Sequence, residues 1–196
     1  MKQLVILGGG FAGLWAAMSA AGERADNKAV KIDITLISKD AHLVIRPRLY
    51  EGAGEDKRVL LKSLLDKIGV RFIQATIESI DPQHKQVLLS NHTSAQISYD
   101  AVILATGSHL KQLNVTGVKQ YGFSADTYEE TERLDQQLTR IVATQEESAK
   151  TLVVIGAGFT GLELATELRS RLKKKSDKTC RIILVDKEEM AGAELG

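Results

Sequence analysis

The feature that most constrains this chain is an internal repeat. The segment Leu4–Leu14, LVILGGGFAGL, recurs as Leu152–Leu162, LVVIGAGFTGL. Each copy begins with four apolar residues, continues through a G-x-G-x-x-G turn and leads into a helical pattern. A continuous apolar run is typical of a strand buried on both faces of a parallel sheet. The repeat therefore predicts that one structural unit occurs twice.

A second apolar run follows each copy, at Ile32–Ile37 and at Arg181–Val185. Strand, glycine turn, helix and strand in this order form a βαβ unit, whose two strands are parallel. The predicted fold class is therefore α/β, with two Rossmann-like βαβ units. The second unit is expected to be truncated, because the sequence stops soon after its second strand.

The helix after the first turn is predicted to pack through one apolar face. Leu14, Trp15, Met18 and Ala21 supply the apolar positions of that face. Residues three or four apart lie on the same side of an α-helix. We therefore expect this group of side chains to contact the sheet.

The glycines of such a turn have separate roles. The first permits the tight turn out of the strand, the second lets the backbone approach a pyrophosphate, and the third lets the helix pack closely on the strand. The helix amino terminus adds N–H groups without acceptors in the helix and the positive end of its dipole. Because each turn lies between a strand and a helix, each predicts a dinucleotide site. The expected contacts are Gly8, Gly10, Phe11, Ala12 and Gly13 in the first copy and Gly156, Gly158, Phe159, Thr160 and Gly161 in the second.

The residue after the second strand of each unit distinguishes between nucleotides. Asp186 follows Val185, and a carboxylate there accepts hydrogen bonds from an adenosine ribose and repels a 2′-phosphate, which favours NAD over NADP. The adjacent Lys187 weakens this preference. The corresponding residue of the first unit is Ser38, whose hydroxyl either bonds to a ribose or simply ends the strand.

The segment between the repeats predicts a helix, an antiparallel insertion and one more strand. Leu60–Ile68 has helical spacing, and Gly69 is a suitable helix stop. Val70–Ile80 and Gln86–Ser90 are predicted strands joined by a turn, which together form an antiparallel insertion in an otherwise parallel sheet. Tyr99–Gly107 is predicted to be a further buried strand that ends in a turn of small residues.

A domain boundary is predicted near Gly117, after a short connecting segment. The first domain then covers residues 1–117 and the second, incomplete domain covers residues 118–196. The stretch Ser124–Glu147 of the second domain is polar and is predicted to form a helix.

Composition excludes several classes of function. The net charge of +1 argues against broad attraction to nucleic acid. Cys180 is the only cysteine and cannot form an internal disulfide, so a reducing compartment fits. The apolar runs are too short to span a bilayer, and the four histidines lack metal-ligand spacing. We therefore expect a cytoplasmic protein with no metal and no nucleic-acid partner.

Together these motifs resemble the flavoproteins with two dinucleotide-binding domains. The resemblance spans essentially the whole chain and rests on the two glycine turns, on their order, and on the strand that follows Tyr99 and Asp100. It implies that the first site holds FAD and the second holds NAD(P)H. It also implies that Ala105, Thr106 and Gly107, which end that strand, lie against FAD where the chain crosses between domains.

Within that group the chain is most similar to the type II NADH dehydrogenases and their close relatives. His42–Glu51 resembles their loop beside the flavin, and Gly161–Ala165 resembles the start of their second-site helix. The resemblance implies that Glu163 points toward the nicotinamide and the flavin, with a catalytic role. An acidic residue in the first helical turn also stabilises the helix dipole, which is the structural alternative. Arg46 and Pro47 lie in the His42–Glu51 loop and are expected cofactor contacts, and Lys39 and Ile77 are the other expected cofactor contacts.

The chain departs from the family pattern at three points. The family usually has an acid where this chain has Ser38, and a proline is common where Thr116 precedes Gly117. Proteins of the group also continue well past this length, with a second flavin contact and an acceptor-facing region. We therefore expect an amino-terminal part of a longer protein, which by itself holds FAD weakly or not at all and is inactive.

The reaction that the resemblance implies is hydride transfer from NADH to FAD, followed by electron transfer to a quinone. Disulfide reduction and sulfide oxidation gain no support, because they use cysteines and Cys180 is the only one. Two alternatives stay open: a soluble NAD(P)H reductase for a ferredoxin-like protein or another acceptor, and a nucleotide-binding redox sensor without turnover. A quinone acceptor implies peripheral contact with the cytoplasmic membrane face through the region beyond Gly196. A homodimer also stays open.

Overall fold

The computed structural model describes residues 1–29, 31–91, 93, 95–110, 114–144, 150–175 and 180–192. The chain packs as two compact units, each of which contains a parallel sheet. The first unit is formed by Met1–Val44 and Arg58–His109, and the second by Ile45–Lys57 and Leu110–Gly196. The polypeptide therefore passes between the units more than once.

The first unit is built on a four-stranded parallel sheet with the strand order β5-β2-β1-β9. The predicted parallel pairing of the first two strands is confirmed, since Lys2 to Leu7 of β1 pair in register with Ile32 to Ile37 of β2. The strands are β1 (Lys2–Leu7), β2 (Ile32–Ser38), β5 (Arg71–Gln74) and β9 (Ala101–Leu104).

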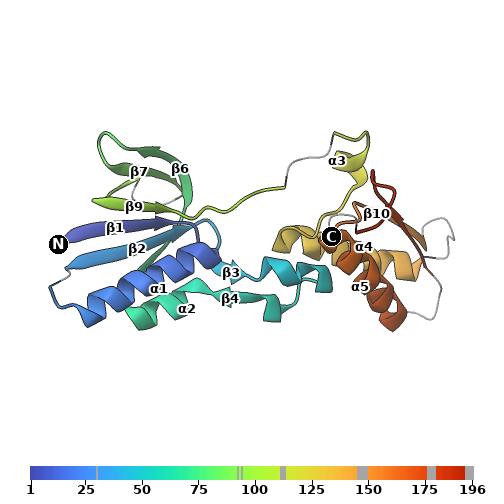
Figure 1. Cartoon of the computed structure of the whole chain (residues 1–196), viewed down its shortest axis with the longest axis horizontal. Helices are drawn as coiled ribbons and strands as arrows, with labels where there is room; N and C mark the ends of the chain where they lie inside the picture. Colours follow the sequence, from blue (N-terminus) through green and yellow to red (C-terminus); the bar gives the residue numbers. More distant parts are fainter. Residues whose placement is uncertain are drawn as a thin grey trace. The chain divides into compact units, whose positions relative to one another are not determined.

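Two different layers cover the faces of this sheet (Figure 1). Helix α1 (Phe11–Asp26) lies on one face and a three-stranded antiparallel sheet lies on the other. Successive side chains of a strand point to opposite faces. Accordingly, Ile6 packs in the core on the α1 side, whereas Val5 and Leu7 pack in the core on the side of the antiparallel sheet.

The predicted packing face of α1 is partly wrong. Leu14, Ala17 and Ala21 are buried against the sheet, but Trp15 is 61% exposed and Met18 is 41% exposed. The third glycine of the turn brings the start of the helix close to the strand, so small residues occupy the line that follows it. The larger side chains lie on the flank of the helix instead.

The predicted antiparallel pairing is confirmed, but its strands β6 (Thr76–Asp81) and β7 (Gln86–Ser90) form a separate sheet with a third strand, β8 (Gln96–Ser98), that the sequence did not predict. The predicted single strand over Val70–Ile80 is divided at Ala75, whose N–H donates to the carbonyl of Ser38 at 3.0 Å. The part before Ala75 is β5 of the parallel sheet, and the part after it is β6. The predicted buried strand near residue 100 is β9, but Leu104 is 67% exposed, and β9 is the last strand in the order of its sheet.

The segment between β2 and β5 contains short elements. β3 (His42–Val44) pairs antiparallel with β4 (Arg58–Leu60), which is followed by α2 (Leu61–Leu65) and the 3-10 helix η3 (Asp66–Ile68). The predicted helix stop at Gly69 is confirmed, since Gly69 adopts a left-handed conformation with φ of 63°. The helix itself begins at Leu61, because Leu60 belongs to β4.

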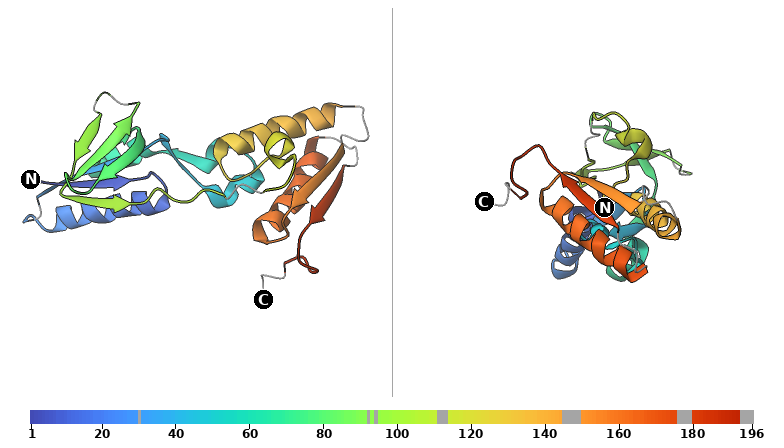
Figure 2. Two further views of the ribbon diagram at one scale, coloured as in Figure 1. Left: turned by 90° about the horizontal axis from the view of Figure 1, so that it is seen from above. Right: turned by 90° about the vertical axis from the view of Figure 1, so that its right-hand side faces the viewer.

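The second unit contains the parallel strands β10 (Thr151–Ile155) and β11 (Arg181–Val185). Helices α4 (Tyr128–Ala143) and α5 (Phe159–Lys175) lie beside these strands (Figure 2). Leu134, Leu138, Leu168 and Leu172 of the two helices are buried together with Val154 of β10. A short helix, α3 (Val118–Tyr121), precedes them. Cys180 packs at the edge of this core.

The structure corrects two predictions in the second unit. Strand β10 is covered on one face only, because Val153 is 57% exposed and Ile155 is 54% exposed. The polar helix starts at Tyr128 rather than at Ser124, since the hydroxyl of Thr127 caps it by accepting the N–H of Glu130 at 3.2 Å. Residues 145–147 of the predicted helix lie outside the described residues.

The packing units also differ from the predicted division at Gly117. The segment Ile45–Lys57 contains the 3-10 helices η1 (Arg46–Glu51) and η2 (Glu55–Lys57) and belongs to the second unit. The reason is that η1 packs against α4 and α5, which the order of residues along the chain could not reveal. Which nucleotide each domain binds stays a prediction.

Candidate nucleotide-binding site

In the first glycine turn, two of the glycines lie very close to other backbone atoms. Gly8 has a φ of +112°, and its N–H donates to the carbonyl of Ile37 at 2.8 Å. A Cβ on Gly8 would lie 2.1 Å from the carbonyl oxygen of Ala105. A Cβ on Gly13 would lie 1.9 Å from the carbonyl oxygen of Gly8. Both positions therefore require glycine, one because of its dihedral angle and neighbour, the other because helix and strand are in contact.

The middle glycine of this turn is different, because it borders open space. A Cβ on Gly10 would meet no atom within 4 Å. Gly10 begins α1 without a side-chain cap, and the next residues, Phe11 and Ala12, are exposed. The N–H groups of a first helical turn have no acceptor within the helix and carry the positive end of its dipole. The turn thus has the room and the donors that a pyrophosphate needs.

The Ala105-Thr106-Gly107 segment, which the resemblance implies lies against FAD, is next to this turn. The N–H of Ala105 donates to the carbonyl of Leu7 at 2.7 Å, and the same residue faces Gly8. Gly107 has a φ of +75°, and Thr106 is exposed. The structure therefore brings together two predicted parts of the site that are far apart in the sequence.

Ser38 also lies beside the first turn. It ends β2 with a buried side chain, and a Cβ on Gly9 would lie 2.7 Å from the Ser38 hydroxyl oxygen. Lys39, the next residue, is exposed and accepts a hydrogen bond from Gln74 through its carbonyl. Ile77 lies in β6 and packs against the core on the side of the antiparallel sheet. The proposed contacts of Ser38, Lys39 and Ile77 with a nucleotide stay predictions.

The second glycine turn repeats the geometry of the first. Gly156 has a φ of +102°, and its N–H donates to the carbonyl of Val185 at 2.8 Å. A Cβ on Gly161 would lie 1.8 Å from the carbonyl oxygen of Gly156. Gly158 precedes α5, and Phe159 and Thr160 are exposed in its first turn. Strand, positive-φ glycine and helix amino terminus are therefore arranged in the same way in both units.

Asp186 holds this second turn from the end of β11. Its carboxylate accepts hydrogen bonds from the N–H of Ala157 and, at 2.9 Å, from the N–H of Glu188. The hydrogen bonds from these backbone donors lower the pKa of the Asp186 carboxyl group below its usual value, and the bond from Ala157 has the larger effect. A charged carboxylate is thus fixed beside the turn, where the sequence predicts the ribose of NAD. Sequence reasoning did not foresee its bond to Ala157.

The remaining predicted residues are placed in the second unit. Arg46 forms an ion pair with the carboxylate of Asp126 and also donates to the Asp126 carbonyl at 3.2 Å. Pro47 lies in the first turn of η1. Glu163 is exposed near the start of α5. Arg46 and Pro47 therefore belong to the unit that contains the second glycine turn, whereas Gly8 and Ala105 belong to the other.

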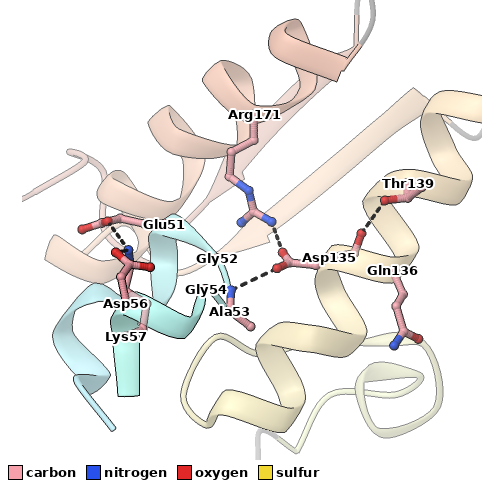
Figure 3. A pocket seen from close by; sticks show the side chains of 10 residues that line it. All are labelled: Glu51, Gly52, Ala53, Gly54, Asp56, Lys57, Asp135, Gln136, Thr139 and Arg171. Carbon is pink, nitrogen blue, oxygen red and sulfur yellow. Dashed lines mark hydrogen bonds and ion pairs between the residues drawn. The ribbon is translucent and has the colours of Figure 1, made fainter. Parts of the chain in front are cut away.

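An open pocket of about 490 Å³ lies between the η1–η2 segment and helices α4 and α5 (Figure 3). None of the predicted nucleotide contacts lines it. Its walls carry two groups of charged side chains, one on the η1–η2 segment and one on the helices. The spacing of these residues in the sequence did not predict that either group would line a pocket. The lining residues are Glu51, Gly52, Ala53, Gly54, Asp56, Lys57, Asp135, Gln136, Thr139 and Arg171.

The charges on the segment form a network of their own. Lys57 is buried and lies 3.0 Å from the carboxylate of Glu51, and it also pairs with Asp56. Arg48 pairs with Glu51 at 2.6 Å. Hydrogen bonds from Arg48 and then Lys57 lower the pKa of Glu51 to about 2. The pKa of Lys57 is raised, mainly by its hydrogen bond to Asp56 and also by the one to Glu51. Burial of Lys57 acts in the opposite direction and lowers its pKa.

Two absences apply to the part of the chain that the structure describes. No described helix combines the length and the apolar character that a membrane-crossing helix requires. No group of three or more His, Cys, Asp or Glu side chains among the described residues is arranged to hold a metal ion.

The two glycine turns and their parallel strands place this chain among the α/β proteins with dinucleotide-binding folds. Sequence comparison makes the assignment specific, since the pyridine nucleotide-disulphide oxidoreductase family matches residues 2–191. The chain belongs to this family. The resemblance to flavoproteins with two dinucleotide-binding domains is thereby confirmed.

Individual relatives agree with this assignment. An NADH dehydrogenase-like protein of Mycobacterium tuberculosis is 37% identical over 204 residues, which cover 100% of this chain and 50% of that protein. Demethylphylloquinone reductase NdbB of Synechocystis is 30% identical over 196 residues, covering 96% of this chain and 48% of the relative. The solved structure of sulfide:quinone oxidoreductase from Aquifex aeolicus superimposes with a TM-score of 0.73 at 27% identity, covering 94% of this chain and 43% of that one. The chain spans about half the length of the curated relatives it matches.

Proposed function

We propose that the protein to which this chain belongs is an FAD-dependent NADH dehydrogenase that passes electrons to a quinone. The observation that carries the proposal is the duplicated turn, in which a positive-φ glycine leads from a parallel strand into a helix with an exposed amino terminus. One such turn serves one dinucleotide. Two turns therefore suit an enzyme that binds FAD and NADH together.

The first turn is proposed to hold FAD and the second NADH. The open space beside Gly10 and the donors at the start of α1 would receive the FAD pyrophosphate, with Thr106 and Gly107 alongside. The start of α5 would receive that of NADH, and Asp186 would accept hydrogen bonds from its ribose. The two bound cofactors would supply the chemistry, which is hydride transfer from nicotinamide to flavin and onward electron transfer. Glu163, two residues beyond Gly161, is proposed to face the reacting rings.

A quinone is proposed as the acceptor because the relatives point to that chemistry. The Synechocystis relative is named a demethylphylloquinone reductase and the Aquifex structure is a sulfide:quinone oxidoreductase. The sulfide chemistry is not part of the proposal, because Cys180 packs against the core of the second unit. Quinones are lipid-soluble, so the proposal includes peripheral contact with a membrane through segments outside this chain.

The test uses the full-length protein. Purified protein should show the visible absorption of a flavin, and the released cofactor should be FAD. Anaerobic addition of NADH should bleach this absorption, and a short-chain quinone should restore it. Absence of flavin after reconstitution with FAD would overturn the proposal. Bleaching without reoxidation by quinone, but with reoxidation by a ferredoxin-like protein, would replace the acceptor.

A further inference from the structure

The segment Ile45–Lys57 contains two of the proposed flavin contacts but packs on the helices of the second unit. Arg46 and Pro47 lie in η1, and the segment consists of two 3-10 helices and a glycine-containing loop, Gly52–Gly54. Such short elements have few internal hydrogen bonds. The position of this segment therefore depends on what it contacts.

Asp135 of α4 and Arg171 of α5 provide a central contact (Figure 3). Their side chains form an ion pair, and that of Arg171 is only 10% exposed. The second carboxylate oxygen of Asp135 accepts the N–H of Ala53 at 3.0 Å. The guanidinium of Arg171 also donates to the carbonyl of Tyr50 at 3.4 Å. The pair thus binds the backbone of the segment at two places, the N–H of Ala53 and the carbonyl of Tyr50.

The close approach of the loop supports this reading. Gly52 has a φ of +118°, and a Cβ there would lie 3.3 Å from the Asp135 carboxylate and 3.6 Å from the Arg171 guanidinium carbon. The backbone therefore passes directly over the ion pair, where a side chain would be strained. Tyr128 adds a third contact, since its hydroxyl donates to the carbonyl of Ala53 at 3.0 Å.

A partly buried ion pair, such as this one with Asp135 31% exposed, is weak evidence for stability, because apolar side chains of similar volume often stabilise a fold equally well. Charged groups differ from apolar ones in that their hydrogen bonds have direction. Burial lowers the pKa of Arg171, as expected for a cation placed away from water. What Asp135 and Arg171 supply beyond packing is therefore a fixed orientation of the backbone from Tyr50 to Ala53.

We infer that Asp135 and Arg171 are positioning residues for the flavin site. They hold the segment that carries Arg46 and Pro47 on α5, the helix whose amino terminus is proposed to bind NADH. Helix α5 would thereby set the place of the flavin-contacting segment relative to the nicotinamide nucleotide. The inference rests on the proposed function and on the expectation, from the sequence resemblance, that Arg46 and Pro47 contact the flavin.

The first test measures backbone hydrogen exchange in the full-length protein without added nucleotide. Asp135→Asn and Arg171→Met should each speed exchange in residues 45–57 by about tenfold, which corresponds to about 1.4 kcal/mol. The double variant should exchange about as fast as either single variant, because both remove one shared contact. Unchanged exchange in residues 45–57, or an equal rise throughout α4, α5 and β10, would overturn the inference.

Matched controls lie on the same two helices. Glu132 of α4 and Arg169 of α5 are exposed, so Glu132→Gln and Arg169→Met change the same charges without touching the loop. Both controls should exchange like the wild type. A control that loosens residues 45–57 as much as Asp135→Asn would show that net charge, rather than the pair, fixes the segment.

The second test reads the flavin directly. In protein reconstituted with FAD, both variants should shift the visible band and the midpoint potential of the flavin, while NADH affinity stays within about twofold of the wild type. Arg171→Lys should show a smaller shift than Arg171→Met, because it keeps the positive charge. It should still differ from the wild type, because one ammonium group cannot replace the planar fork of donors that Arg171 uses on two acceptors. A wild-type spectrum and potential in Asp135→Asn would overturn the positioning role. A full-length protein that takes up no flavin would overturn the proposed function. The hydrogen-exchange result would in that case still decide whether Asp135 and Arg171 hold residues 45–57 in place.

Discussion

At the scale of single residues, the glycines of the first turn separate into two kinds. Gly8 and Gly13 are required by the fold, because an added Cβ would overlap backbone atoms of Ala105 and Gly8. Gly10 faces open space, so the lack of a side chain at this position leaves room for a ligand. The motif G-x-G-x-x-G therefore combines folding and binding requirements, which substitutions can separate.

Gly8→Ala and Gly10→Ala should accordingly fail in different ways. Gly8→Ala should lower the free energy of unfolding by about 1–3 kcal/mol or more, because φ of +112° strains an L-residue and the Cβ meets Ala105. Gly10→Ala should lower it by less than about 1 kcal/mol. Gly10→Ala should instead weaken FAD binding, because its methyl group occupies the proposed pyrophosphate space. Urea unfolding and FAD titration of the full-length protein measure the two effects. Equal stability losses in both variants would contradict this division.

The sequence identified these site residues by type and order but not by their contacts. It placed Asp186 after a strand, and the structure shows that backbone N–H groups of Ala157 and Glu188 bind its carboxylate. It could not find Asp135 or Arg171 either. They lie 36 residues apart, on helices that only tertiary packing brings together, and each has an ordinary place on a polar helix.

At the scale of elements, the η1–η2 segment is stabilised by charges whose effect depends on pH. Glu51 has a pKa of about 2, below its ordinary 4.5, because Arg48 and Lys57 donate to it. A carboxyl group whose pKa is depressed by folding stabilises the folded state above its ordinary pKa and loses this effect as pH falls toward the folded value. The stabilisation is therefore complete above pH 4.5 and is lost between about pH 4.5 and 2.

Glu51→Gln should remove this part of the acid sensitivity. Acid titration followed by proteolysis at the loop Gly52–Gly54 should show a shallower loss of protection in the variant than in the wild type between pH 4.5 and 2. Glu132→Gln, on the exposed side of α4, should leave the profile unchanged. Identical profiles for Glu51→Gln and the wild type would show that other carboxylates govern the acid response of the segment.

The elements themselves were largely predictable, because apolar runs and glycine turns are local signals. β1, β2, β10 and β11 and the helix after each turn follow directly from the repeat. The degree of burial was less predictable. The apolar runs of β9 and β10 suggested full burial, whereas β9 ends its sheet and β10 is covered on one face. Hydrophobicity indicates that a strand can be buried, and the arrangement of neighbouring elements decides whether it is.

At the scale of the whole molecule, two similar units differ in the residue after their second strand. The first unit has Ser38, which is buried beside the turn, and the second has Asp186, whose carboxylate is fixed by backbone donors. A fixed negative charge selects against a phosphate, and an uncharged hydroxyl does not. In the proposed function, the two turns share one design and this position distinguishes the nucleotides that they bind.

The full-length protein should for this reason use NADH in preference to NADPH. Asp186→Ser should reduce the ratio of kcat/KM for NADH to that for NADPH by about tenfold or more, which corresponds to about 1.4 kcal/mol in transition-state binding. The 2′-phosphate of NADPH would then meet a hydroxyl instead of a carboxylate, while Lys187 remains as a neighbouring cation. Lys187→Ala is the matched control and should raise the same ratio, because it removes the one adjacent charge that favours a phosphate. Steady-state rates with both coenzymes measure the effect, and a ratio that Asp186→Ser leaves unchanged would place coenzyme selection elsewhere in the protein.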